Sequence, residues 1–178
     1  MKFIINNIKG AFFVKEAQDL KKSIRAIKPN SDFTIKHYTN YTVIKNKFVF
    51  IAYWNGYVNF TKVANEFDIF QAIEEFENLT KILCQRNYEI HSINAHGKTK
   101  INSSITEIKD QARRLSLCPT NINRNFSPAL FLKFENGTFM LFQSGNFSIL
   151  GVKHEKDLHE ICKKVEHLIA KCVSTQTP

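Results

Sequence analysis

The segments 49–79 and 138–168 follow the same residue pattern without a gap. Gly56 in the first segment corresponds to Gly145 in the second, and the apolar and acidic positions that follow also coincide. Self-similarity at a fixed spacing indicates that one structural unit is built more than once. The chain must therefore fold in a way that gives two similar halves.

The beginnings of the two copies correspond as well. Ile-Asn-Asn-Ile at 5–8 resembles Ile-His-Ser-Ile at 90–93, so the second copy carries about four extra residues before its later strands. The length of 178 residues suits one compact domain with a sizeable core. We predict a single domain over 1–178, with one repeat over about 1–87 and the other over about 88–178.

Each copy predicts the same order of elements: a strand, an amphipathic helix, several short strands and a long closing helix. We expect opening strands at 3–14 and 89–96, first helices at 16–27 and 103–115, and closing helices at 66–86 and 155–173. Pro29 and Pro119 mark the ends of the first helices, because proline cannot continue a helix. Asn46-Lys47 and Asn136-Gly137 divide the short strands into hairpins.

Apolar residues recur along the closing helices at steps of three and four, which is typical of a helix face packed on a sheet. In the second copy they are Leu158, Cys162, Val165, Ile169 and Cys172; in the first they are Ile69, Ile73, Phe76 and Leu83. We therefore expect Cys162 and Cys172 in the core. The four cysteines form no C-x-x-C pair and are expected to be free thiols.

Both faces of the predicted sheet are apolar. Side chains alternate along a strand, so Phe139 and Leu141 point to one side and Met140 and Phe142 to the other. The predicted helices suffice to cover one face. The second face, apolar and aromatic, requires a partner or an oligomer.

Composition excludes several classes of protein. The 43% hydrophobic content is too high for a disordered chain, and no apolar run is long enough for a membrane-spanning helix. The N-terminus lacks the pattern of a signal peptide. The formal charge of +9 favours a polyanionic partner through counterion release, although charge alone does not identify one.

The sequence contains no convincing catalytic motif. His154 and His159 are too far apart for the i, i+4 spacing of an H-E-x-x-H zinc site, and Gly97-Lys-Thr lacks the leading glycine of a P-loop. We therefore expect a binding protein and not an enzyme, with no metal site.

The duplicated order of elements, the basic charge and the aromatic open face together resemble the core domain of the TATA-box-binding protein family. Leu-Phe-Gln-Ser-Gly-Asn-Phe-Ser-Ile-Leu-Gly-Val-Lys at 141–153 is similar to the family's phenylalanine, small-residue and Gly-Lys segment with its Thr-Gly-Ala-Lys continuation. Asn-Phe-Ser-Pro-Ala-Leu-Phe at 125–131 resembles its Phe-Pro-Gly-Leu strand entry, and 5–8 resembles its Gln-Asn-Ile opening. The resemblance implies an α+β saddle, in which a curved antiparallel sheet of ten strands carries four helices on its convex face.

The resemblance also implies a function. The family binds A·T-rich duplex DNA in the minor groove and bends it by inserting aromatic side chains between base steps. It implies general transcription initiation factors and the RNA polymerase machinery as protein partners, a homodimer as the alternative cover of the sheet without DNA, no cofactor and no membrane. The expected location is the nucleus, or the cytoplasm for an archaeal protein or a virus that replicates there.

Carried over residue by residue, the resemblance assigns three sets of DNA contacts. The aromatic wedges are Phe126, Phe142, Tyr53 and Tyr38; the groove residues are Asn7, Ser92, Thr61 and Met140; the phosphate contacts are Lys45, Lys133 and Lys153. At four positions the residue of this chain differs from the one that is typical of the family. Ser92 replaces an asparagine, Leu150 replaces a threonine, and Tyr57 and Asn146 replace lysines.

Two other interpretations stay open, and the departures favour the first of them. In one, the protein keeps the fold, has lost TATA specificity, and acts through non-specific DNA binding or as a protein-interaction scaffold. In the other, a saddle or helix-grip domain uses its curved sheet to hold a small apolar ligand.

Overall fold

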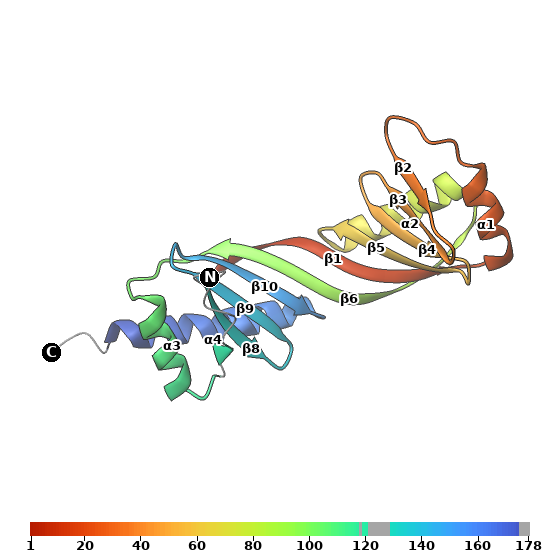
Figure 1. Cartoon of the computed structure of the whole chain (residues 1–178). Helices are drawn as coiled ribbons and strands as arrows, with labels where there is room; N and C mark the ends of the chain where they lie inside the picture. The colour runs from red at the N-terminus through yellow and green to blue at the C-terminus, as the bar shows by residue number, and fades with distance from the viewer. Residues whose placement is uncertain (118, 121–128, 175–178) are drawn as a thin grey trace. The chain divides into compact units, whose positions relative to one another are not determined.

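The computed structural model describes residues 1–117, 119–120 and 129–174 (Figure 1). The strands are β1 Lys2–Val14, β2 Thr34–His37, β3 Tyr41–Lys45, β4 Val49–Tyr53, β5 Tyr57–Val63, β6 Cys84–Lys98, β7 Pro119–Thr120, β8 Ala129–Phe134, β9 Gly137–Phe142 and β10 Asn146–Val152. The helices are α1 Ala17–Ala26, α2 Glu66–Thr80, α3 Ile105–Arg114 and α4 Glu155–Ser174.

The chain divides into two compact units. The N-terminal unit comprises Asn6–His91, and the C-terminal unit comprises Met1–Ile5 together with Ser92–Pro178. The long strands β1 and β6 contribute to both units. Figure 1 shows β2–β5 with α1 and α2 in the N-terminal unit, and β8–β10 with α3 and α4 in the C-terminal unit.

The strands follow the order β2-β3-β4-β5-β1-β6-β10-β9-β8-β7. The pairs within each unit are antiparallel, and β7 is only two residues long. The predicted α+β class is confirmed, and the described residues form ten strands, antiparallel within each unit, and four helices. Among the helices that the structure describes, none is long and apolar enough to cross a membrane.

Phenylalanine rings form the core of the N-terminal unit. Phe76 of α2 meets Phe12 of β1 at a ring-centroid distance of 5.5 Å and Phe50 of β4 at 5.3 Å, both edge to face. All three side chains are buried. The predicted helix face with Ile69, Ile73 and Phe76 therefore packs on the sheet.

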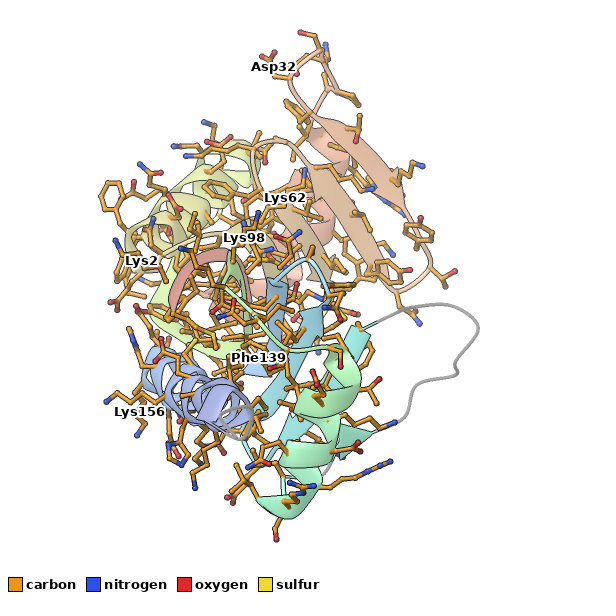
Figure 2. All side chains as sticks on the ribbon, turned by 90° about the vertical axis from the view of Figure 1, so that its left-hand side faces the viewer. Lys2, Asp32, Lys62, Lys98, Phe139 and Lys156 are labelled. Atoms are coloured by element: carbon orange, nitrogen blue, oxygen red, sulfur yellow. The ribbon has the colours of Figure 1, made fainter. Side chains whose placement is uncertain are left out.

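In the C-terminal unit α4 contributes buried aliphatic and cysteine side chains to the core, and the rings come from the strands. Phe139 of β9, labelled in Figure 2, stacks on Phe147 of β10 at 5.0 Å, and both are buried. Cys162 and Cys172 of α4 lie in the core, as predicted. Burial raises the pKa of both thiols.

The predicted extent of the second helix is wrong. α2 ends at Thr80 and not at residue 86, because Lys81 takes a left-handed conformation (φ 60°) and its N–H bonds the carbonyl of Glu77. The chain then enters β6, and the N–H of Cys84 donates to the Glu77 carboxylate at 2.7 Å. Leu83, predicted to extend the buried face, is 61% exposed.

The pairing of β1 with β5 has a counterpart in the pairing of β6 with β10. Ile8 lies opposite Val63, and Ile93 lies opposite Val152. Next to each pair the register shifts. Lys62 and Gly151, which lie at these irregularities, have positive φ angles of 66° and 76°.

Candidate nucleic-acid interface

In each unit the helices cover one face of the strands; the other face is called the open face here. Along β3 and β4 buried residues alternate with half-buried ones, and the pairing register places the half-buried set on one side. Thus Tyr41 lies opposite Tyr53 and Val43 lies opposite Ile51. The predicted second apolar face therefore exists in the N-terminal unit.

An aromatic row crosses this open face. It consists of Tyr38, Tyr41, Tyr53, Tyr57 and Phe13, from the end of β2 to β1. Successive ring centroids are 4.6, 5.6, 6.1 and 5.1 Å apart. Aromatic pairs at such distances attract one another beyond the area they bury. The rings between the two ends therefore hold one another in place.

His91 of β6 joins the row at its β1 end. Its ring lies 6.4 Å from that of Tyr57, and its Nε2 atom is 3.0 Å from the Tyr57 hydroxyl. The Glu89 carboxylate lies 3.7 Å from the same nitrogen. Burial, and then the nearby charge of Glu89, raises the pKa of Tyr57. The hydroxyl therefore stays protonated at neutral pH and can take part in this hydrogen bond.

The structure brings two predicted wedges into this row but does not place them side by side. Tyr41 lies between Tyr38 and Tyr53 and contacts both rings. Tyr41 was not predicted as a site residue, although its alternation with Val43 and Lys45 along β3 could have placed it on the open face. Phe126, the fourth predicted wedge, lies outside the described residues.

The matching positions of the C-terminal unit carry fewer rings. Phe142 is half-buried on β9 and lies opposite Ala129, just as Tyr53 lies opposite Tyr41. Asn146 opposite Lys98 replaces the pair of Tyr57 and Phe13. Met140, a predicted groove residue, lies on the same open face, opposite Phe131 and Ser148.

The predicted groove residue Asn7 has an internal role. Its Oδ1 atom accepts hydrogen bonds from the Thr61 hydroxyl at 2.7 Å and from the Lys62 N–H at 2.9 Å. Asn7 thereby satisfies the backbone at the β1–β5 irregularity and joins two predicted groove residues. Its amide Nδ2 is the group that could donate to minor-groove acceptors.

In the C-terminal unit Asn94 has the corresponding role. Its Oδ1 accepts from the Gly151 N–H at 3.1 Å, although Ser92 is the residue that corresponds to Asn7 by register. Ser92 is half-buried. The replacement of an asparagine by Ser92 is therefore compensated two residues later, as far as support of the backbone is concerned.

We expect Asn7→Ala to lower the free energy of unfolding by about 1–3 kcal/mol, because it removes the acceptor of two hydrogen bonds. Urea denaturation followed by circular dichroism measures the change. Asn6→Ala, at the exposed neighbouring position, is the matched control and should change stability by less than about 0.5 kcal/mol. Equal effects of the two substitutions would contradict the internal role of Asn7.

Two of the predicted phosphate contacts lie together. Lys133 of β8 and Lys153 after β10 line one surface depression of the C-terminal unit, which Lys156 of α4 also lines. Lys156 is labelled in Figure 2 and was not predicted. Asp157, beside them, is buried and accepts from the Asn136 amide at 3.3 Å. The depression therefore presents three ammonium groups together with the exposed carboxylate of Glu135.

Lys45, the third predicted phosphate contact, lies at the end of β3 on the open face of the N-terminal unit. A hollow on the same face is lined by Lys9, Val49, Ile51, Asn59, Thr61 and His91. Lys9 was not predicted; its alternation with Asn7 along β1 is the signal that could have found it. The open face thus combines aromatic rings, aliphatic side chains and separated lysines.

Comparison with protein-family models and with curated proteins finds no match for this chain. Comparison with solved structures does find matches. One is "Methanococcus jannaschii TBP", with a TM-score of 0.77 and 18% sequence identity, covering 96% of this chain and 99% of that one. The resemblance inferred from the duplicated pattern is thus confirmed at the level of the fold. The chain has a TBP-like fold.

Proposed function

We propose that this protein is a TATA-binding-protein-like transcription initiation factor, which binds A·T-rich duplex DNA in the minor groove. The observation that carries the proposal is the half-buried, aromatic and basic open face on a chain of TBP-like fold. In this proposal the open faces contact the DNA bases, and the helices on the opposite faces bind initiation factors and the polymerase. The protein would act where the genome is transcribed.

The chemistry of the open face suits the minor groove. Phe142, Met140 and Leu150 offer apolar surface in the C-terminal unit, and Leu150 is 39% exposed. Unstacking a base step costs a few kcal/mol, and an inserted apolar ring offsets part of that cost. Lys45, together with the depression at Lys133, supplies positive charge for the phosphates.

Binding and bending of a labelled duplex test this proposal. An A·T-rich duplex and a G·C-rich duplex of equal length, each with a donor and an acceptor dye at its ends, are titrated at several salt concentrations. We expect tighter binding to the A·T-rich duplex and increased energy transfer, because bending brings the ends together. We expect Phe142→Ala to reduce the bend and weaken binding about tenfold or more.

Phe67→Ala is the matched control for that variant. Phe67 lies on α2 and is 68% exposed, so its replacement removes a ring of the same kind away from the open face. It should bind and bend DNA like the parent protein. Equal affinity for both duplexes without increased energy transfer would contradict minor-groove recognition.

That outcome would favour the second candidate, a TBP-like protein without TATA specificity. One structural observation supports it: Tyr41, Tyr53 and Tyr57 are each flanked by rings on both sides and are not free to enter a base step. Asn146 and Tyr57 also stand where the family has lysines. Such a protein would bind DNA through charge alone or serve as a scaffold.

A further inference from the structure

The aromatic row has an exposed end at Tyr38. This ring stacks on Tyr41 with an angle of 18° between the ring planes, and Tyr38 is 48% exposed. The inner rings of the row have neighbours on both sides, whereas Tyr38 has one in the row. The row therefore stops at a flat apolar surface onto which one more planar group could stack.

The turn that carries Tyr38 is fixed by hydrogen bonds. The N–H of Tyr38 donates to the carbonyl of Tyr41 at 2.9 Å. The indole of Trp54 donates to the carbonyl of Thr39 at 2.8 Å, and the Trp54 N–H donates to that of Asn40. A ring held in this way loses little conformational freedom when a ligand stacks on it, so binding costs less.

The charge of this face favours a polyanion. Lys36 lies two residues before Tyr38, opposite Val43, and so projects from the open face. Lys45 and Lys9 lie on the same face. The acidic group that the structure places beside the row, Glu89, is near His91 at the opposite end. Lys36 therefore places positive charge near the exposed end, whereas Glu89 lies at the opposite end of the row, where His91 and Lys9 line one hollow.

We propose that the N-terminal unit binds single-stranded nucleic acid, with an unpaired base stacked on Tyr38 and its phosphates near Lys36. A paired base inside a duplex already has neighbours on both faces, whereas an unpaired base has a free face. Aromatic side chains beside a basic surface are the usual means of binding single strands. This activity goes beyond duplex recognition and does not depend on Phe142.

Fluorescence anisotropy with labelled single strands tests the proposal. The probes are twelve-residue oligothymidylate and oligouridylate, which cannot form duplexes, titrated at low and at moderate salt. We expect binding that weakens as salt rises, and about five- to hundredfold weaker binding for Tyr38→Ala, the range seen when a stacking ring is removed. Comparison of the two probes tells whether DNA or RNA is preferred.

Two control variants separate stacking from general effects. Tyr38→Phe keeps the ring and should bind within about twofold of the parent protein. Phe67→Ala removes an exposed ring from α2, away from the open face, and should leave binding unchanged. Tyr38→Trp gives a direct signal, because a stacked base quenches indole fluorescence; Trp54 is the only other tryptophan and supplies the background.

The result that overturns the proposal is absence of single-strand binding at low salt, or equal binding by Tyr38→Ala and the parent protein. A chain that sediments as a dimer and does not bind the probes would overturn the proposal and favour a second copy as the occupant of this face. Duplex binding is measured on the same proteins. Single-strand binding by a protein that shows no preference for the A·T-rich duplex would contradict only the proposed function. Preferential binding and bending of the A·T-rich duplex without single-strand binding would contradict only this inference.

Discussion

Gly10→Ala is expected to lower the free energy of unfolding by about 3 kcal/mol, at the upper end of what overpacking usually costs. A Cβ atom at Gly10 would lie 2.3 Å from the carbonyl oxygen of Glu89 and 2.5 Å from Cζ of Phe60. The first contact is with the backbone of the adjacent strand, which cannot move without loss of its pairing. The second is with a buried ring that has no room to retreat.

Urea denaturation of Gly10→Ala measures this effect, and Gly151→Ala is the matched control. A Cβ at Gly151 would meet no heavy atom within 4 Å, but its φ of +76° makes a side chain costly by about 1–2 kcal/mol. The control therefore isolates backbone strain from overpacking. An unchanged unfolding midpoint for Gly10→Ala would show that β1 and β6 do not approach as closely as described.

Gly97 of the C-terminal unit should respond in the same way. Its Cβ would lie 2.4 Å from the carbonyl of Lys2 and 2.5 Å from Cζ of Phe147. Both glycines lie opposite a phenylalanine, Gly10 opposite Phe60 and Gly97 opposite Phe147. In both units, a glycine in the long strand thus leaves room for the phenylalanine ring of the residue paired with it.

Alignment of the two copies could not reveal this pairing of a glycine with a phenylalanine. By the strand register Gly10 corresponds to Ala95, and Gly97 corresponds to Phe12. The repeat was visible in the sequence because hairpins and core positions coincide, and these follow from local alternation. A glycine required by a close contact between distant strands shows only in three dimensions.

The same limit explains the error at the end of α2. Leu83 continues the apolar spacing of the helix, so the sequence pattern extends the helix through it. The helix ends at the left-handed Lys81, and the Glu77 side chain then binds the N–H of Cys84 at the start of β6, with the Arg86 guanidinium 2.9 Å from the same carboxylate. A tertiary contact therefore outweighs the local pattern.

For the candidate interface, the sequence pattern predicted which residues lie on the open face, but not the hydrogen bonds and ring contacts that these residues make. Alternation along β9 correctly placed Met140 and Phe142 on one face of the strand and Phe139 and Leu141 on the other. The hydrogen bond from Thr61 to Asn7 joins residues far apart in the chain, and no local pattern indicates it. The contacts of Tyr41 with two other rings likewise depend on the β2–β3–β4 register.

Phe76→Ala is expected to lower the free energy of unfolding by about 3–5 kcal/mol, the usual cost of deleting a buried aromatic ring. Phe76 is fully buried, and its ring meets Phe12 and Phe50 on the two strands beneath α2. Its removal leaves a cavity between helix and sheet that these rings can fill only in part. Loss of this magnitude is a large share of the stability of a typical domain.

Phe67→Ala, in the same helix, provides the comparison. Phe67 is 68% exposed, so removal of an identical ring should change the free energy of unfolding by less than about 0.5 kcal/mol. Urea titrations of both variants, followed by circular dichroism, give the two values under one set of conditions. If the two losses were equal, α2 would not pack on the sheet through the face that carries Phe76, and the opposite face of the strands would not be the open one. The assignment of the aromatic row to a ligand-binding surface therefore depends on a clear difference between these two substitutions.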